Sequence, residues 1–172
     1  MAQFNDFSLR DLYMALDTQR QEQGLSWSQA AMEINRHNTR VSTRRMATST
    51  ITGTRFRAAA EGDGVLQMLR WLKRTPESFI PGFLESGGFD ELLPEVLPTQ
   101  VLRFDTRKLY AALDAQRTER NISWKQLAKE VGMSSSMLTH LSKGGRTSFP
   151  TVMRMTRWLG RPTAEFTRGC AR

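Results

Sequence analysis

The residues with the clearest chemical potential are arginines in a segment that contains no acid. Between Asn35 and Ala60 the sequence has six arginines and no aspartate or glutamate. They are Arg36, Arg40, Arg44, Arg45, Arg55 and Arg57. Guanidinium groups hold phosphate oxygens through paired hydrogen bonds, and a run of like charges repels itself unless a polyanion neutralises it. The segment is either a solvated loop or, as we favour, a surface that contacts phosphates.

A second polar group consists of hydroxyl side chains and one imidazole. Residues 134–140 read SSSMLTH, and residues 47–53 read ATSTITG. Serine and threonine hydroxyls both donate and accept hydrogen bonds, which suits contact with polar edges of either kind. Read alone, such segments are poor helix formers that serve only packing.

The overall charge also favours a polyanionic partner. The 172 residues carry 25 Lys+Arg against 17 Asp+Glu, a formal net charge of +8. Residues 83–105 have five acids and one base, so an acidic stretch separates two basic ones. Nucleic acid or an anionic membrane surface fits this balance. The basic residues do not line a long amphipathic helix, and no stretch of 18 apolar residues or signal peptide is present, so we expect a cytoplasmic protein without membrane contact.

Catalytic and metal chemistry find no support in the sequence. The single cysteine, Cys170, can form no disulfide within the chain, and the two histidines, His37 and His140, are far apart. Phosphate-binding GxxxxGK[ST], HExxH and GxSxG motifs are all missing. We therefore expect no enzyme activity, no metal and no cofactor. The four tryptophans are expected to pack in cores.

An internal repeat organises the chain. LYMALDTQR at 12–20 returns as LYAALDAQR at 109–117, identical at seven of nine positions. LRWL at 69–72 returns as TRWL at 156–159, but the offset has fallen from 97 to 87. The sequence therefore predicts two copies of one unit, with ten extra residues between the second and third helices of the first copy.

Each copy reads as a string of short helices. Helix-capping residues predict first helices after Ser8 and Asp105, and Ser–x–x–Gln capping boxes predict second helices after Ser26 and Ser123. Fourth helices are expected over 64–72 and 149–159, followed by short terminal helices at 75–79 and 162–166 that seat a phenylalanine each. The stretch between the copies is expected to be a connector, partly helical around 89–93.

The second copy contains a helix-turn-helix pattern, LAKEVGMSSSMLTHL, at 127–141. Ala128 is small enough for a close helix crossing, and Gly132 tolerates the positive φ of a tight turn. Five apolar residues have the spacing of inner faces. They are Leu127, Val131, Met133, Leu138 and Leu141.

With these residues the chain resembles the Cro/repressor-like (XRE-like) helix-turn-helix family, over residues 104–168. The resemblance implies a five-helix bundle whose third helix lies in the DNA major groove. It also implies that Ser135, Ser136 and His140, with Thr139 beside them, face base edges. Residues expected near the DNA backbone are Gln126, Ser134, Lys143 and Arg146.

The first copy departs from this pattern. NRHNTRVSTR follows its second helix where the tight turn should be, and the third helix restarts near Met46. Thr48, Ser49 and Thr52 fall on the expected reading face, and Ile51 on the inner face. Thr54 replaces the apolar Leu141 of the second copy. The arginine-rich turn is expected to follow the DNA backbone or enter a minor groove.

Together these patterns predict an all-α protein with two tandem five-helix bundles: residues 1–82, a connector at 83–103, and residues 104–172. The expected function is sequence-specific binding of double-stranded DNA by a bacterial or phage-type transcriptional regulator, nucleoid-associated when bound. Its recognition helices would be 134–142 and 47–56. It would act as a homodimer or as a monomeric pseudo-dimer. The alternative is an adaptor, such as an antitoxin or phage-type inhibitor, that uses this fold to hold a protein partner.

Overall fold

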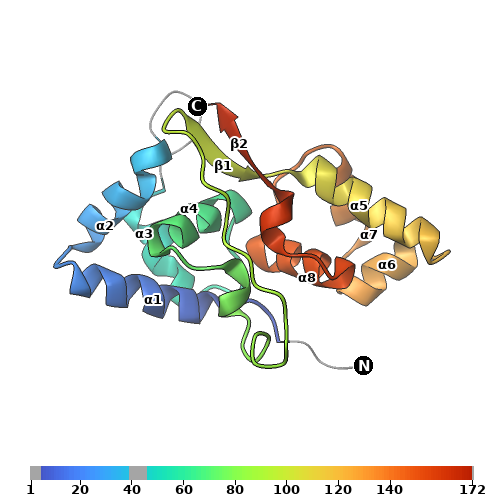
Figure 1. Ribbon diagram of the computed structural model, residues 1–172, viewed down its shortest axis with the longest axis horizontal. Helices are drawn as coiled ribbons and strands as arrows, with labels where there is room; N and C mark the ends of the chain where they lie inside the picture. The colour runs from blue at the N-terminus through green and yellow to red at the C-terminus, as the bar shows by residue number, and fades with distance from the viewer. Residues whose placement is uncertain (1–4, 39–45, 172) are drawn as a thin grey trace.

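The computed structural model describes residues 5–38 and 46–171, which fold into helices and one small sheet (Figure 1). The first half contains α1 (Leu9–Glu22), α2 (Trp27–Ile34), η1 (Asn35–Asn38), α3 (Thr48–Thr52), η2 (Gly53–Arg55), α4 (Gly62–Leu72) and η3 (Pro76–Phe79). The second half contains β1 (Gln100–Phe104), α5 (Thr106–Glu119), α6 (Trp124–Val131), α7 (Ser135–Ser142), α8 (Phe149–Leu159), η4 (Thr163–Phe166) and β2 (Thr167–Ala171). The helices of the first half lie on the left of Figure 1, and those of the second half lie on the right.

All four predicted caps start their helices where expected, although one of the two capping boxes is incomplete. Ser8 Oγ accepts from the Asp11 N–H, and Asp105 accepts from the Lys108 N–H. At Ser26 both bonds of the capping box form, because the Gln29 side chain also accepts from the Ser26 N–H at 2.8 Å. Before α6 only half of the box forms: the Gln126 N–H donates to Ser123 Oγ at 3.1 Å, and the Gln126 side chain does not return the bond. The prediction of a second complete box is wrong.

Residues that recur in the sequence make the same contacts in both halves. In each half an arginine near the end of the first long helix pairs with an aspartate one turn earlier and stacks over the tryptophan that begins the next helix. In each half a second tryptophan donates its indole N–H to a glutamate. The contacts are Arg20–Asp17 and Arg117–Asp114 (2.6 Å each), Arg20–Trp27 (4.9 Å) and Arg117–Trp124 (4.8 Å), and Trp71–Glu33 (3.0 Å) and Trp158–Glu130 (2.8 Å). All four tryptophans are half-buried against the core, as expected.

The halves meet through matching residues. Residues 60–62 run antiparallel to residues 147–149, which lie at the offset of 87. The Gly62 N–H donates to the Thr147 carbonyl at 2.9 Å, and the Phe149 N–H donates to the Ala60 carbonyl at 2.8 Å. Helix α4 contacts α8, and η3 contacts η4. Such a reciprocal arrangement of matching residues indicates a local two-fold axis that relates the two halves.

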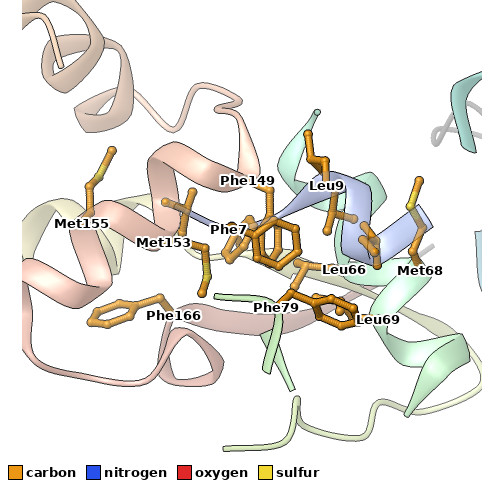
Figure 2. Close-up of a cluster of buried hydrophobic side chains, with 14 of the residues drawn as sticks. Phe7, Leu9, Leu66, Met68, Leu69, Phe79, Phe149, Met153, Met155 and Phe166 are labelled. Carbon is orange, nitrogen blue, oxygen red and sulfur yellow. The ribbon is translucent and has the colours of Figure 1, made fainter. Parts of the chain in front are cut away.

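The segment that precedes each first helix crosses to the other half. Ahead of α1, the centroid of the Phe7 ring lies 4.6 Å from the centroid of the Phe149 ring in α8. Ahead of α5, the Phe104 N–H donates to Asp63 in α4 at 2.9 Å. Figure 2 shows Phe7, Phe79 and Phe149 together at the centre of the resulting cluster. The buried side chains of both halves therefore form one continuous core.

One matched pair at this junction is very unequal in size. Gly62 occupies the place that Phe149, a fully buried ring, occupies in the other half. A Cβ on Gly62 would lie 2.8 Å from Cε2 of Phe104 and 2.9 Å from the Thr147 carbonyl oxygen. The space that a side chain at 62 would need is therefore already filled, so the two-fold is approximate at its centre.

The prediction of an all-α protein is wrong in one respect. Strands β1 and β2 pair antiparallel, with Gln100 opposite Ala171 and Phe104 opposite Thr167. Strand β1 occupies the end of the predicted connector. The expected helix around 89–93 does not form either. That stretch lies between the Gly87-Gly88 pair and Pro94, and the proline disfavours helical backbone at the residue before it and cannot donate a helical hydrogen bond.

Candidate nucleic-acid interface

The helix-turn-helix pattern of the second half folds as its spacing predicts. Gly132 ends α6 with a φ of +76°, in the left-handed region that favours glycine. The Met133 N–H then donates to the Ala128 carbonyl at 2.9 Å, which fixes the turn. Ala128 is buried where the helices cross. Of the five predicted inner residues, four are buried and Met133 is half-buried: Leu127, Val131, Leu138 and Leu141 are the buried ones. The inner face was predicted correctly.

The opposite face of α7 is polar and open to solvent. All four predicted base-reading residues are exposed: Ser135, Ser136, Thr139 and His140. Their hydroxyls make only local bonds, such as Thr139 Oγ1 to the Ser135 carbonyl at 3.3 Å and Ser136 Oγ to Ser134 Oγ at 2.9 Å. Exchanging such exposed local bonds for bonds to a ligand costs little, so this face can bind a polar surface.

The predicted backbone residues of the second half surround the same helix. Gln126, Ser134, Lys143 and Arg146 are all exposed. Lys143 and Arg146 also line a 390 Å³ pocket at the junction of the halves.

Three further cations line that pocket, and sequence reasoning missed them: Arg103, Arg107 and Arg168. Arg103 and Arg168 are cross-strand partners in the sheet. Each lies near an acid, at 4.0 Å from Asp63 and 3.9 Å from Asp105 respectively. No sequence signal points to them, because only the β1–β2 pairing and the contact between halves bring them together.

The reading segment of the first half is shorter and less exposed. Helix α3 covers Thr48–Thr52 and continues as η2 to Arg55, within the predicted range 47–56. Ser49 is exposed, whereas Thr48 and Thr52 are half-buried. Ile51 is fully buried, as expected. Thr54, at the place of Leu141, is also buried, and its hydroxyl donates to the Ile51 carbonyl at 2.7 Å. A hydroxyl is accommodated there because that bond satisfies it.

Asn35 holds the two ends of the first-half insertion together. This buried side chain donates to the carbonyls of Ala31 (2.8 Å) and Met46 (2.9 Å) and accepts from the Met46 N–H (3.0 Å). The ten residues between Asn35 and Met46 therefore begin and end at one point, and α3 can start beside α2 despite the insertion.

Three of the six arginines of the first half can be placed. Arg36, Arg55 and Arg57 are exposed, while Arg40, Arg44 and Arg45 lie outside the described residues. The Arg55 guanidinium lies 5.2 Å from the centroid of the Phe56 ring, and Phe56 is 82% exposed. The end of this reading segment thus presents cations and one aromatic ring to solvent.

A buried carboxylate lies apart from this interface, between η3 and η4. Glu77 is fully buried; its Oε1 accepts from the Thr163 N–H at 2.8 Å, and its Oε2 has no hydrogen-bond partner among the described residues. Burial raises the pKa of Glu77 to about 7, against the opposing effect of the Thr163 bond, with Asp90 and Glu91 adding repulsion. The residue type and sequence position gave no signal of this burial.

The described part of the chain has neither a cluster of metal-binding side chains nor a helix that could span a membrane. Over residues 5–38 and 46–171, no cluster of three His, Cys, Asp or Glu side chains could hold a metal ion. Within the same ranges, no helix has the length and apolar character needed to cross a membrane.

Comparison with known proteins supports the reading of the second half. A family model described as helix-turn-helix matches residues 113–166, from within α5 to the end of η4. This segment is under a third of the 172 residues, and the first half is not included. No curated protein and no solved structure matches the chain. Residues 113–166 are therefore similar to helix-turn-helix domains of the XRE type.

Proposed function

We propose that this protein is a transcriptional regulator that binds double-stranded DNA in a sequence-specific manner. One observation carries the proposal: within a segment that matches the helix-turn-helix family, α7 buries Leu138 and Leu141 and exposes Ser135, Ser136, Thr139 and His140. An exposed polar helix face of this kind fits the major groove. Hydroxyls contact either base type, so the preference for one sequence is modest.

The first half acts as a second, divergent reading head, and each half is a bundle of the same type. The recurring contacts of the two halves and the local two-fold at Gly62 and Phe149 support this view. Elements related by a two-fold axis face the same side along that axis, so α3 and α7 can approach one duplex together. A single chain then serves as a pseudo-dimer, and its preferred site is asymmetric because the heads differ.

Phosphate contacts supply most of the affinity. In the second half Gln126, Ser134, Lys143 and Arg146 contact the backbone, and Arg107 joins them from the same pocket. In the first half the arginines from Arg36 to Arg57 do so. The affinity should fall with salt by about 0.9 log units per log unit of salt for each phosphate neutralised.

The proposal is tested by selection from a randomised duplex library at moderate salt. The wild-type chain should enrich a defined, non-palindromic site. The triple variant S135A/S136A/H140A should lose the preference and keep most of the bulk affinity, since its cations are intact. A control triple variant at exposed residues away from α7, S28A/T99A/T118A, should select the wild-type site.

Three outcomes would count against this reading. A perfectly palindromic site would favour ordinary homodimers over the pseudo-dimer. An unchanged preference in the α7 variant would remove α7 as the reading helix. A failure of the wild-type chain to enrich any sequence would leave the protein adaptor as the better account.

A further inference from the structure

The two halves contain matching grooves, each beside the half-buried tryptophan that ends the fourth helix. The groove of the first half has a volume of 520 Å³ and that of the second half 450 Å³. Five lining residues of one groove correspond in sequence to five of the other. The pairs are Glu33 and Glu130, Ile34 and Val131, Gln67 and Arg154, Arg70 and Arg157, and Trp71 and Trp158. Each groove is therefore a property of the repeated unit.

In the first half the chain itself forms the outer wall of this groove. Residues 92–96, Leu-Leu-Pro-Glu-Val, line it opposite Trp71. Leu93 and Val96 are half-buried and pack against the core, and Glu95 lies among Arg70, Lys73 and Arg74 in the lining. An extended segment with apolar side chains, a proline and a carboxylate thus lies along one side of the groove.

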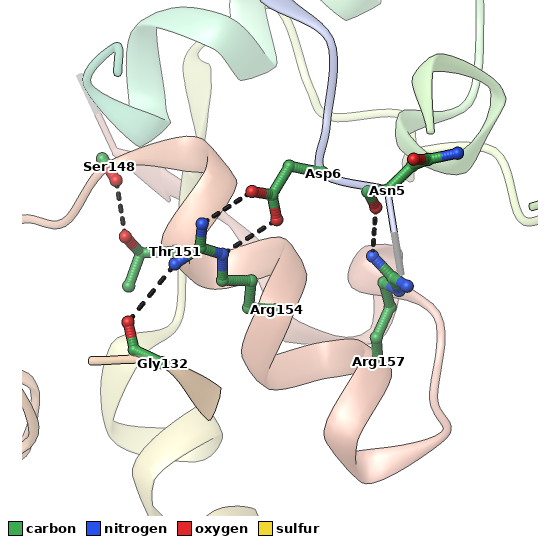
Figure 3. Close-up of polar contacts among 7 residues, drawn as sticks. All are labelled: Asn5, Asp6, Gly132, Ser148, Thr151, Arg154 and Arg157. Carbon is green, nitrogen blue, oxygen red and sulfur yellow. Dashed lines mark hydrogen bonds and ion pairs between the residues drawn. The ribbon is translucent and has the colours of Figure 1, made fainter. Parts of the chain in front are cut away.

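In the second half no such segment covers the groove within residues 5–38 and 46–171. Its edge is formed by Asp6 of the first half and by Phe83 of the connector. Figure 3 shows how this edge is fixed: the Arg154 guanidinium donates to both carboxylate oxygens of Asp6 and to the Gly132 carbonyl, and Arg157 donates to the Asn5 carbonyl. Arg157 also lies 5.5 Å from the centroid of the Phe83 ring.

The lining of the open groove has two cations, Arg154 and Arg157, and two acids, Asp6 and Glu130. Arg154 stands where the first half has neutral Gln67, whereas the first groove has two further cations, Lys73 and Arg74, at and beyond the end of α4. The acids of the open groove are already engaged, since Asp6 pairs with Arg154 and Glu130 pairs with Arg120 at 2.9 Å. A pocket of this size, with an indole, a valine and fixed cations, suits apolar side chains flanking a carboxylate.

We propose that the groove beside Trp158 binds an extended segment of a partner protein that resembles residues 92–96 of this chain, with apolar residues around a proline and a glutamate. In the first half the connector lies along this groove, and the second half offers the same groove to another chain. This inference does not depend on DNA binding.

The experiment uses the full ¹⁵N-labelled chain and a synthetic peptide with the sequence of residues 91–97, ELLPEVL. The reporters are the indole N–H signals of Trp158 and Trp71, each bonded to a glutamate. The peptide should shift the Trp158 signal with a dissociation constant of about 1 mM or tighter. It should leave the Trp71 signal in place, because the connector already lies along that groove.

Variants and control peptides separate this site from unspecific binding. Arg157→Glu should weaken peptide binding at least about fivefold, since it reverses a charge in the groove. Lys125→Glu, an equal charge change at an exposed residue of α6 outside the groove, should change it less than twofold. A peptide of scrambled sequence should bind more weakly than ELLPEVL.

Several results would overturn the proposal. The first is that the Trp158 signal does not move at saturating peptide. The second is that the Trp71 and Trp158 signals shift equally, and the third is that the two variants weaken binding equally. A fourth result can come from sedimentation of the chain alone. If the chain self-associates and the peptide dissociates it, the occupant is a second copy and the partner protein is ruled out.

Discussion

Glu77 should make the stability of this protein fall as the pH rises through neutrality. The side chain is fully buried between η3 and η4, where the two halves meet, and only one of its oxygens has a hydrogen-bond donor. Burial raises its pKa from 4.5 to about 7. The folded chain therefore keeps this proton at pH values where the unfolded chain has lost it.

The sign and size of the effect follow from linkage. Between pH 4.5 and 7 the folded state binds more protons at Glu77 than the unfolded state does, so the free energy of unfolding decreases as the pH rises. Integrated from pH 5 to pH 8, the loss is about 2–3 kcal/mol, at about 1.4 kcal/mol for each pH unit in which only the folded chain holds the proton. Above pH 8 the contribution is constant.

The assay is urea unfolding at pH 5, 6, 7 and 8, followed by tryptophan fluorescence. Glu77→Gln keeps an oxygen for the Thr163 N–H and cannot ionise, so the difference between wild type and variant isolates the titration. That difference should shift by about 2–3 kcal/mol toward the variant between pH 5 and pH 8. Glu85→Gln, the same change at an exposed position, should run parallel to wild type. If the Glu77→Gln difference varies by less than about 0.5 kcal/mol, the buried carboxylate does not titrate as reasoned.

Three further predictions concern packing and hydrogen bonds, each measured by urea unfolding at pH 6. Gly62→Ala should cost about 1–3 kcal/mol, because the new Cβ would lie 2.8 Å from the Phe104 ring; an unchanged midpoint would show that the junction yields. Asn35→Ala should lower the free energy of unfolding by about 1–3 kcal/mol, because it leaves the N–H and carbonyl of Met46 without the Asn35 side chain. The variant should also bind DNA more weakly overall while keeping the base preference that α7 provides. Equal loss of overall affinity and of base preference would contradict a role confined to the first half. Asp6→Asn should cost less than about 1 kcal/mol, since solvent screens this half-exposed ion pair, and a larger loss would mean that the N-terminal segment holds the halves together.

Local signals in the sequence predicted much of the fold. Capping residues located the starts of α1, α2, α5 and α6, because a cap bonds to backbone groups within one turn. Apolar spacing and Gly132 predicted the inner face and turn of the helix-turn-helix, since both depend on residues a few positions apart.

The features that sequence reasoning missed depend on partners far along the chain. Strand β1 forms because a tail some 70 positions later lies beside it, and neither strand has a strong pattern of its own. Glu77 is buried by η4 of the other half, so its elevated pKa has no local cause. Thr54 differs from these features, because the Ile51 carbonyl that accommodates its hydroxyl is only three residues away.

The candidate interface also has one part that local sequence signals explain and another part that depends on distant contacts. The exposure of Ser135, Ser136, Thr139 and His140 follows from helical periodicity within α7, whereas their contact with base edges stays a prediction. The arginines of the junction pocket were not found, because the contact between the halves assembles them. These arginines extend the basic surface toward the middle of the molecule.

The unequal pair at the centre of the junction makes the two halves complementary rather than interchangeable. Two copies of the second half could not meet as the halves do here, because two phenylalanines would compete for the room that one ring and one hydrogen atom now share. Two copies of the first half would leave a hole there. The two halves therefore cannot exchange places at this junction.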